Sequence, residues 1–97
     1  MTGFYYSHDG YWDEGYMYSG YKTKIECANT CTKDCFGIHT YAIANYYYTA
    51  NCYHYSNRAV LVNTNVKISS GSKAYIKCSV PMNEGTVSNS KFCDSIC

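Results

Sequence analysis

The stretch TKIECANTCTKDC, residues 23–35, predicts a short helix that carries cysteines. Thr23 and Glu26 form a capping-box pattern, which satisfies backbone donors at the start of a helix. Cys27 and Cys31 lie four residues apart, and this spacing places their thiols on one helical face. We therefore expect a helix here that disulfides tie to the strands that follow it.

This helix is expected over about Lys24 to Lys33. An amphipathic pattern predicts that its buried stripe consists of Ile25, Cys27, Ala28 and Cys31.

Length and cysteine content predict one small secreted domain. A chain of 97 residues buries a small core, and seven cysteines compensate for this if they form disulfides. There is no hydrophobic segment near Met1 and no apolar run long enough to span a bilayer, so we expect a mature or trimmed form without a membrane span. Net charge is +1 with scattered Lys and Arg, which argues against nucleic acid and anionic membranes as partners.

The rest of the chain predicts strands and turns. A polar loop is expected over residues 63–72, in which Val66 and Ile68 can pair locally. Aromatic, β-branched or alternating runs predict strands at Phe4–Ser7, Tyr11–Trp12, Tyr16–Ser19, Phe36–Ala44, Cys52–Ser56, Ala59–Val62 and Lys73–Val80.

These segments predict a single α+β domain over residues 1–97, an antiparallel sheet with one α-helix packed across it. Its core is expected over about residues 20–78. Residues 79–97 are expected to form a C-terminal tail pinned by cysteines.

Thirteen tyrosines, against three phenylalanines and one tryptophan, are the unusual feature of the composition. Tyr41, Tyr53 and Tyr75 lie inside predicted strands near cysteines, so we expect them to fill the core. Further aromatic residues are too many to hide in a domain of this size, and exposed aromatic patches mark binding surfaces. The candidate binding residues are Tyr5, Tyr6, Tyr11, Trp12, Tyr46, Tyr47 and Tyr48.

The chain resembles the PAN/apple domain family over roughly residues 20–78. The segments that carry the resemblance are ECANTC (26–31), CFGIHTYAI (35–43), CYHYS (52–56) and KAYIKC (73–78). The resemblance implies a helix on an antiparallel sheet, a disulfide between Cys27 and Cys52, and a disulfide between Cys31 and Cys35. It also implies binding of proteins or carbohydrates without catalysis.

The chain departs from that family because no cysteine precedes the helix to tie the termini together. Cys78 is therefore expected to pair with Cys93 or Cys97, and the odd count leaves one thiol over. That thiol is either buried and inert or linked to another chain.

Other chemistries are less well supported by the residue pattern. The run Cys27, Cys31, Cys35 and His39 could supply four zinc ligands, but the last step enters a strand that swings side chains apart, so structural disulfides are favoured. His8, His39 and His54 are expected to be surface or half-buried residues without a catalytic partner. We assign no catalytic residue, metal site or cofactor.

Two functions remain from the sequence. One is a secreted, non-enzymatic module that binds protein or glycan through tyrosines on the sheet face away from the helix. The other is a structural subunit that self-assembles into a filament or matrix, through the leftover cysteine or through strand addition at an edge such as Phe4–Ser7.

Overall fold

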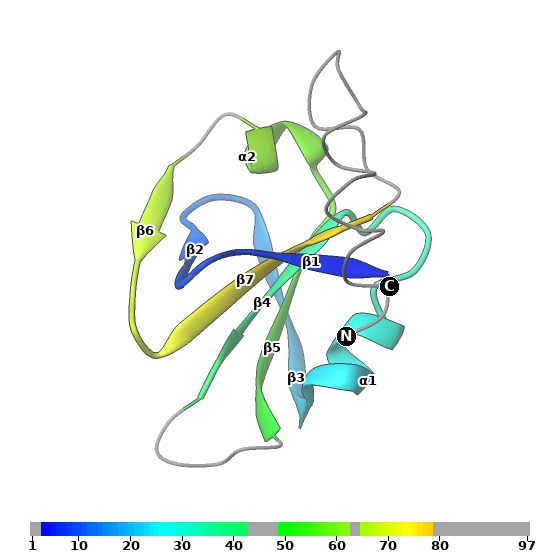
Figure 1. Cartoon of the computed structure of the whole chain (residues 1–97). Helices are drawn as coiled ribbons and strands as arrows, with labels where there is room; N and C mark the ends of the chain where they lie inside the picture. Colours follow the sequence, from blue (N-terminus) through cyan, green and yellow to red (C-terminus); the bar gives the residue numbers. More distant parts are fainter. Residues whose placement is uncertain (1–2, 43–48, 63–64, 79–97) are drawn as a thin grey trace.

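The computed structural model describes residues 3–42, 49–62 and 65–78. Within them, strands dominate and two short helices interrupt them (Figure 1). In chain order the elements are β1 (Phe4–His8), β2 (Gly10–Trp12), β3 (Tyr16–Thr23), α1 (Lys24–Asn29), β4 (Gly37–Tyr41), β5 (Thr49–Tyr55), α2 (Arg58–Val62), β6 (Val66–Ile68) and β7 (Ser72–Lys77).

Five strands form one antiparallel sheet in the order β1-β7-β4-β5-β3. The strands β2 and β6 form a separate two-stranded ribbon, which contacts the main sheet through β7. Figure 1 shows α1 beside β3 and β5, with the ribbon and α2 at the other side of the molecule. Among the described strands, β1 and β3 are the sheet edges, since each pairs with a single described strand.

Side-chain alternation along the strands separates two core clusters, one on each face of the sheet. One cluster packs under α1 and contains Phe4, Cys27, Ala28, Cys31, Cys35, Ile38 and Cys52, with Tyr75 against it. The other lies under the ribbon and α2 and contains Trp12, Tyr55, Val60, Leu61, Ala74 and Ile76, with Tyr5 and Phe36 against it. The predicted α+β class with an antiparallel sheet is confirmed. One helix was predicted, whereas the structure has a helix on each face of the sheet.

The start of α1 is as predicted and its end is not. The Thr23 hydroxyl accepts from the Glu26 backbone N–H at 3.1 Å, which is the N-cap bond expected of the capping pattern. The helix ends at Asn29, four residues before the expected boundary, where the Thr30 hydroxyl donates to the Glu26 carbonyl at 2.8 Å. In so short a helix Cys27 and Ala28 turn to the sheet, and Ile25, predicted to be buried, is 66% exposed.

Two disulfides fasten α1 and the loop after it. Cys27 is bonded to Cys52 on β5, with Cα atoms 5.6 Å apart, and Cys31 is bonded to Cys35 with Cα atoms 5.0 Å apart. Both pairings are those that the resemblance implied. Cys78 is also disulfide-bonded.

The segment Ala59–Val62 was predicted as a strand, and this prediction is wrong because it forms most of α2. The Asn57 side chain accepts from the Ala59 N–H at 3.0 Å and so caps the first turn. Leu61 then packs over Gly37, where an added Cβ would lie 3.0 Å from a Leu61 methyl carbon. Val66 and Ile68 were predicted to pair locally within a loop, and this is wrong because they form β6, whose partner is the distant strand β2.

Several predictions fall outside the described residues. They concern Tyr46, Tyr47, Tyr48, Cys93, Cys97 and the tail over residues 79–97. Among the described helices, none has the length and apolar character needed to cross a membrane.

Candidate functional site

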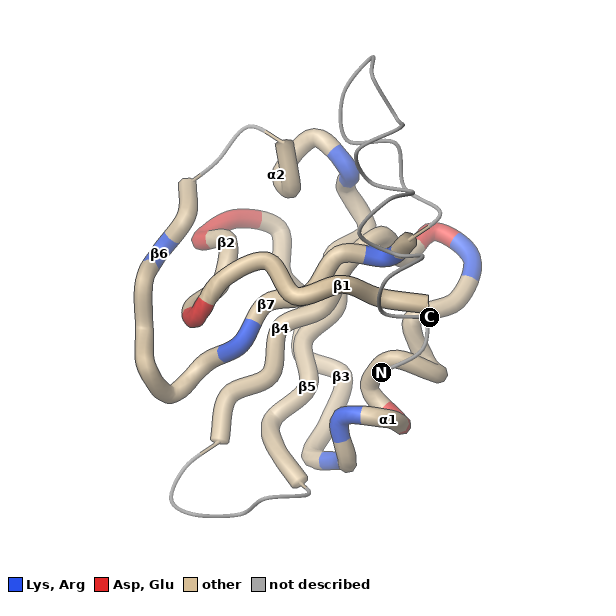
Figure 2. The backbone as a smooth tube through the Cα atoms, in the orientation of Figure 1, with Lys and Arg blue, Asp and Glu red and all other residues tan. Residues whose placement is uncertain are grey.

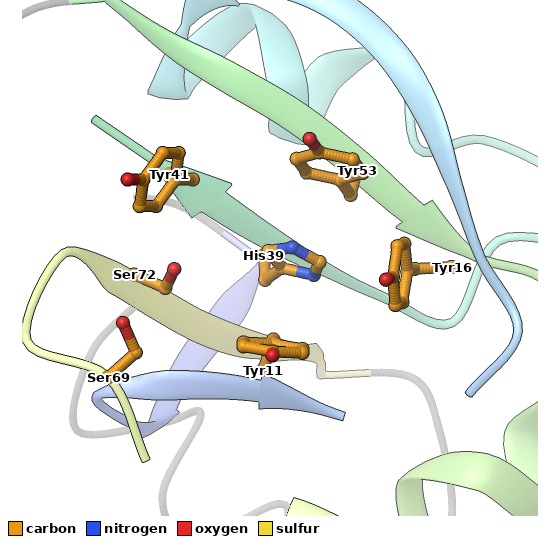
Figure 3. A pocket seen from close by; sticks show the side chains of 7 residues that line it. All are labelled: Tyr11, Tyr16, His39, Tyr41, Tyr53, Ser69 and Ser72. Atoms are coloured by element: carbon orange, nitrogen blue, oxygen red, sulfur yellow. The ribbon is translucent and has the colours of Figure 1, made fainter. Parts of the chain in front are cut away.

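An aromatic hollow of about 280 Å³ opens on the sheet face away from α1. It lies where β3, β4 and β5 face the β2–β6 ribbon and the turn that leads into β7 (Figure 3). We call it the tyrosine hollow, and it is lined by Tyr11, Tyr16, His39, Tyr41, Tyr53, Ser69 and Ser72.

His39 lies at the floor of the tyrosine hollow and is anchored from behind by Tyr55. Only 4% of His39 is exposed, and its Nδ1 lies 2.6 Å from the Tyr55 hydroxyl oxygen. The same hydroxyl accepts from the Trp12 backbone N–H at 3.0 Å and donates to the Trp12 carbonyl at 2.9 Å. One phenol oxygen thus joins β2, β4 and β5 beneath the hollow.

This hydrogen-bond network assigns the tautomer of His39. The Tyr55 hydroxyl has one proton, and it donates this proton to the Trp12 carbonyl. His39 Nδ1 must therefore carry a proton and donate it to the Tyr55 oxygen. Burial, with a smaller contribution from His8, lowers the pKa of His39 to about 4. The ring is therefore neutral at pH 7, and its Nε2 is a hydrogen-bond acceptor.

The acceptor Nε2 of His39 faces the tyrosine hollow. Among the described residues, no group bonds to Nε2, and no side-chain nitrogen or oxygen that is sealed from solvent lacks a partner. Nε2 therefore reaches solvent, and the hollow that His39 lines is where it does so. Ser72 is similar, since it is buried and its hydroxyl has no partner within the described residues.

Aromatic stacking holds the walls of the hollow in place. The Tyr53 ring stacks on the His39 ring with centroids 4.4 Å apart and planes 10° apart, and Tyr11 lies 5.3 Å from the same imidazole. Tyr16 stands almost perpendicular to Tyr53, at 89° and 5.5 Å. Figure 3 shows the Tyr53, His39 and Tyr11 rings as a column with Tyr16 closing one side. Edge and face contacts of this kind are favourable ring geometries.

None of the described residues that line the hollow has a charged side chain. The nearby strands β4 and β5 carry no Lys, Arg, Asp or Glu, and Figure 2 shows charged positions elsewhere along the described chain. Two described ion pairs lie on the neighbouring elements, Lys73 with Asp9 at 2.7 Å and Lys67 with Asp13 at 4.0 Å, and none of these residues lines the hollow. The hollow is thus polar, aromatic and neutral.

No protein-family model, curated protein or solved structure matches this chain.

The predicted binding aromatics are distributed between the hollow, the core and the outer surface. Tyr11 lines the hollow, whereas Tyr5 packs against the core and burial raises the pKa of its phenol. Tyr6 is exposed on β1 and donates to the Asp9 carboxylate at 2.6 Å. Trp12 was predicted to be a surface residue, and this is wrong: it is 1% exposed, because β2 turns its indole under the ribbon onto Tyr55.

The sequence analysis missed most of the lining. Tyr41, predicted to be a core residue, is 40% exposed at the rim, and Tyr53 is half-buried in the wall. His39, predicted to be a surface or half-buried residue, is buried. His39 and Tyr41 are two residues apart, as are Tyr53 and Tyr55, so each pair shares one face of its strand. This spacing was the sequence signal that could have indicated the hollow.

Cys27, Cys52 and His54 lie close together on the α1 side of the sheet without free thiolates for a metal ion. Cys27, Cys52 and His54 bring their donor atoms within 4.8 Å of one another, but the two sulfurs are bonded to each other and offer no thiolate. His54 Nε2 lies 3.0 Å from the Cys27 carbonyl oxygen, to which it donates. In the disfavoured zinc alternative, Cys27, Cys31 and Cys35 are all disulfide-bonded and His39 lies on the opposite face of the sheet.

Stability is expected to fall as the pH drops from 6.5 to 4, because His39 resists protonation only in the folded state. An unfolded histidine takes up a proton near pH 6.5, and folded His39 does so near pH 4. The stabilisation is fully present above pH 6.5 and amounts to about 3 kcal/mol, which is lost across this interval. Urea unfolding at pH 7, 5.5 and 4 measures it.

The control for this prediction is His39→Phe, which keeps a ring between Tyr53 and Tyr11 and cannot titrate. His54 and Asp9, whose pKa values are also lowered, are present in both proteins and cancel in the difference. Parallel pH dependence of the two proteins would contradict the assignment of His39 as a buried neutral base.

Proposed function

We propose that this chain is a secreted, non-catalytic recognition module of the PAN/apple kind that binds protein or carbohydrate. The observation that carries the proposal is the tyrosine hollow, in which a buried neutral histidine presents an unpaired acceptor between tyrosine rings. Ligand sites are typically concave and aromatic, with a few polar groups that fix orientation. The hollow has this composition, and it lies on the sheet face opposite the disulfide-tied helix.

Binding without catalysis fits the chemistry of the hollow. A histidine with a pKa of about 4 is a weak base at neutral pH, and its Nδ1 partner is the Tyr55 phenol and not a carboxylate. Ser69 and Ser72 therefore have no strong general base beside them in the lining. These side chains can orient a ligand by hydrogen bonds but are not equipped to break a bond in it.

An extracellular location is proposed from the disulfides. All five described cysteines are oxidised, and such bonds persist in oxidising compartments. The described part of a 97-residue chain relies on them for its core, since Cys27 and Cys52 are among its fully buried side chains. These features are consistent with secretion.

Self-assembly is the second candidate function, and the open edge at β3 favours it. This strand is eight residues long, and Lys22 is its only charged residue. Long, weakly charged edges promote strand addition. Four large side chains of β3 are exposed, namely Tyr16, Met17, Tyr18 and Tyr21. Because Cys78 is bonded, the candidates for a leftover thiol that links copies are Cys93 and Cys97, which lie outside the described residues.

Tyr41→Ala is expected to weaken ligand binding by about tenfold or more, because it removes a ring at the rim of the hollow. The probe is a printed panel of neutral, sialylated and sulfated glycans together with a peptide library. The matched control is Tyr21→Ala, since Tyr21 is 55% exposed on β3 and does not line the hollow.

Equal binding by the two variants would place recognition elsewhere on the surface. A wild-type protein that retains nothing from the panel would overturn the recognition module. Light scattering, with reducing and non-reducing gels, tests the second candidate: a ladder that dithiothreitol removes would favour assembly over a lone binder.

A further inference from the structure

We propose that the tyrosine hollow receives one neutral saccharide ring, which donates a hydroxyl hydrogen bond to His39 Nε2. This inference rests on the proposed function, and it narrows the ligand from protein or carbohydrate to an uncharged sugar. Four features of the hollow support it.

The first feature is the fixed acceptor that His39 presents at the floor of the hollow. His39 Nδ1 is committed to Tyr55, so Nε2 is held as an acceptor whose direction the strand and the stacked rings determine. Nε2 reaches solvent through the hollow, so a ligand that displaces this solvent and offers no donor leaves the acceptor unpaired, which is costly. The ligand must therefore offer an O–H or N–H group at the floor.

The second feature is the polar wall opposite the rings. Ser69 and Ser72 lie together on the side of the hollow between Tyr41 and Tyr11 (Figure 3). A serine hydroxyl both donates and accepts, and so does a phenol. A ring that carries several hydroxyls can satisfy these groups and Nε2 together, whereas the single hydroxyl of a tyrosine side chain cannot.

The third feature is the pair of crossed aromatic walls. The Tyr16 ring is nearly perpendicular to both Tyr53 and Tyr11, at 89° and 85°. A saccharide ring has apolar C–H faces as well as hydroxyl edges, so it can lie against one of these rings while its edge reaches His39. Burial of such C–H surface contributes a favourable apolar term.

The fourth feature is the size and neutrality of the hollow. Its volume of about 280 Å³ is near the lower limit of small-molecule sites, which suits one ring and not a packed protein surface. None of the lining residues that the structure describes carries a charge, and neutral His39 cannot pair with a carboxylate. A uronic or sialic acid would be desolvated there without a counter-charge, which is unfavourable.

The test is a nuclear magnetic resonance titration of the ¹⁵N-labelled full chain at pH 7. The neutral probes are the methyl glycosides of glucose, galactose, mannose and N-acetylglucosamine. Glucuronic acid is the charged match for glucose, and N-acetyltyrosinamide represents a peptide aromatic. The imidazole nitrogen signals of His39 report the tautomer and the hydrogen bond at Nε2 directly.

We expect the apo protein to show the Nδ1–H tautomer and at least one neutral glycoside to shift the His39 Nε2 signal saturably. Glucuronic acid should bind about tenfold more weakly than the neutral glycoside. His39→Phe should weaken glycoside binding by about tenfold or more, whereas Tyr21→Ala should leave it unchanged. The nitrogen signals and the comparison with glucuronic acid use wild-type protein, so they hold even if His39→Phe fails to fold.

Other outcomes separate this inference from the proposed function. If N-acetyltyrosinamide binds in the hollow and the glycosides do not, the saccharide inference is overturned and the recognition module stands with a peptide ligand. Saturation by glucuronic acid equal to that of the glycosides, an Nε2–H tautomer, or no binding by any probe would each overturn the inference.

Discussion

Replacing Cys27 and Cys52 together by alanine is expected to lower the free energy of unfolding by about 3.5 kcal/mol. This bridge closes a loop with a sequence separation of 25, and the loss of that constraint on the unfolded chain accounts for a value of this size. Both sulfurs are fully buried against Ile38 and Phe4, so their removal also reduces packing under α1. Urea denaturation followed by circular dichroism measures the change.

The matched control is the second bridge. Cys31 and Cys35 are only four residues apart, and the same relation gives about 2 kcal/mol for their replacement by alanine. The long bridge joins α1 to β5, whereas the short one closes a turn whose carbonyls also bind Lys77, with Nζ 2.9 Å from the Cys31 oxygen. A loss at the short bridge equal to or larger than the loss at the long one would contradict this account.

Local signals in the sequence were sufficient for the start of α1. Thr23 and Glu26 are three residues apart and bond within one turn, so this contact needs no distant partner. The cysteine pairings followed from the resemblance. The strand predicted over Lys73–Val80 corresponds to β7, which ends at Lys77. The sequence also predicted that tyrosines would gather on the sheet face away from α1.

The sequence did not correctly predict the element whose secondary structure depends on tertiary contacts. Four apolar residues in a row, Ala59 to Val62, fit a buried strand as well as a helical turn. The Asn57 cap and the space above Gly37 favour the helix. Gly37 lies twenty residues before Asn57 in the chain. Short apolar runs have this ambiguity whenever the deciding neighbour is remote.

The hollow was missed for the same physical reason. His39 presents Nε2 as an acceptor because its Nδ1 binds Tyr55, which lies two residues along β5 from the cross-strand partner Tyr53. The Tyr55 hydroxyl is in turn bonded to the backbone of Trp12, 43 residues earlier in the chain. Strand register determines which side chains of neighbouring strands come into contact. Turn and hydrophobic patterns specify the register poorly when both faces of the sheet are aromatic. The count of tyrosines indicated a binding surface, but not which tyrosines form it.

Trp12→Ala is expected to lower the free energy of unfolding by about 3–5 kcal/mol, as is usual when a buried aromatic side chain is truncated. The indole packs edge-on against Tyr55 with centroids 5.1 Å apart and against His8 at 5.0 Å. Trp12 is the one tryptophan of the chain, so unfolding must be followed by circular dichroism and not by indole fluorescence.

Trp12→Phe is the control, because it retains a ring beneath the ribbon and the smaller cavity should reduce the loss of stability. The Tyr55 hydroxyl binds the backbone of Trp12 and not its indole, so His39 keeps its anchor in this variant and the hollow should keep its ligand affinity. If Trp12→Ala changed stability by less than about 1 kcal/mol while abolishing binding, the indole would be a contact residue and not part of the core. That result would contradict the inward position of β2, and with it the support that the ribbon provides to the hollow.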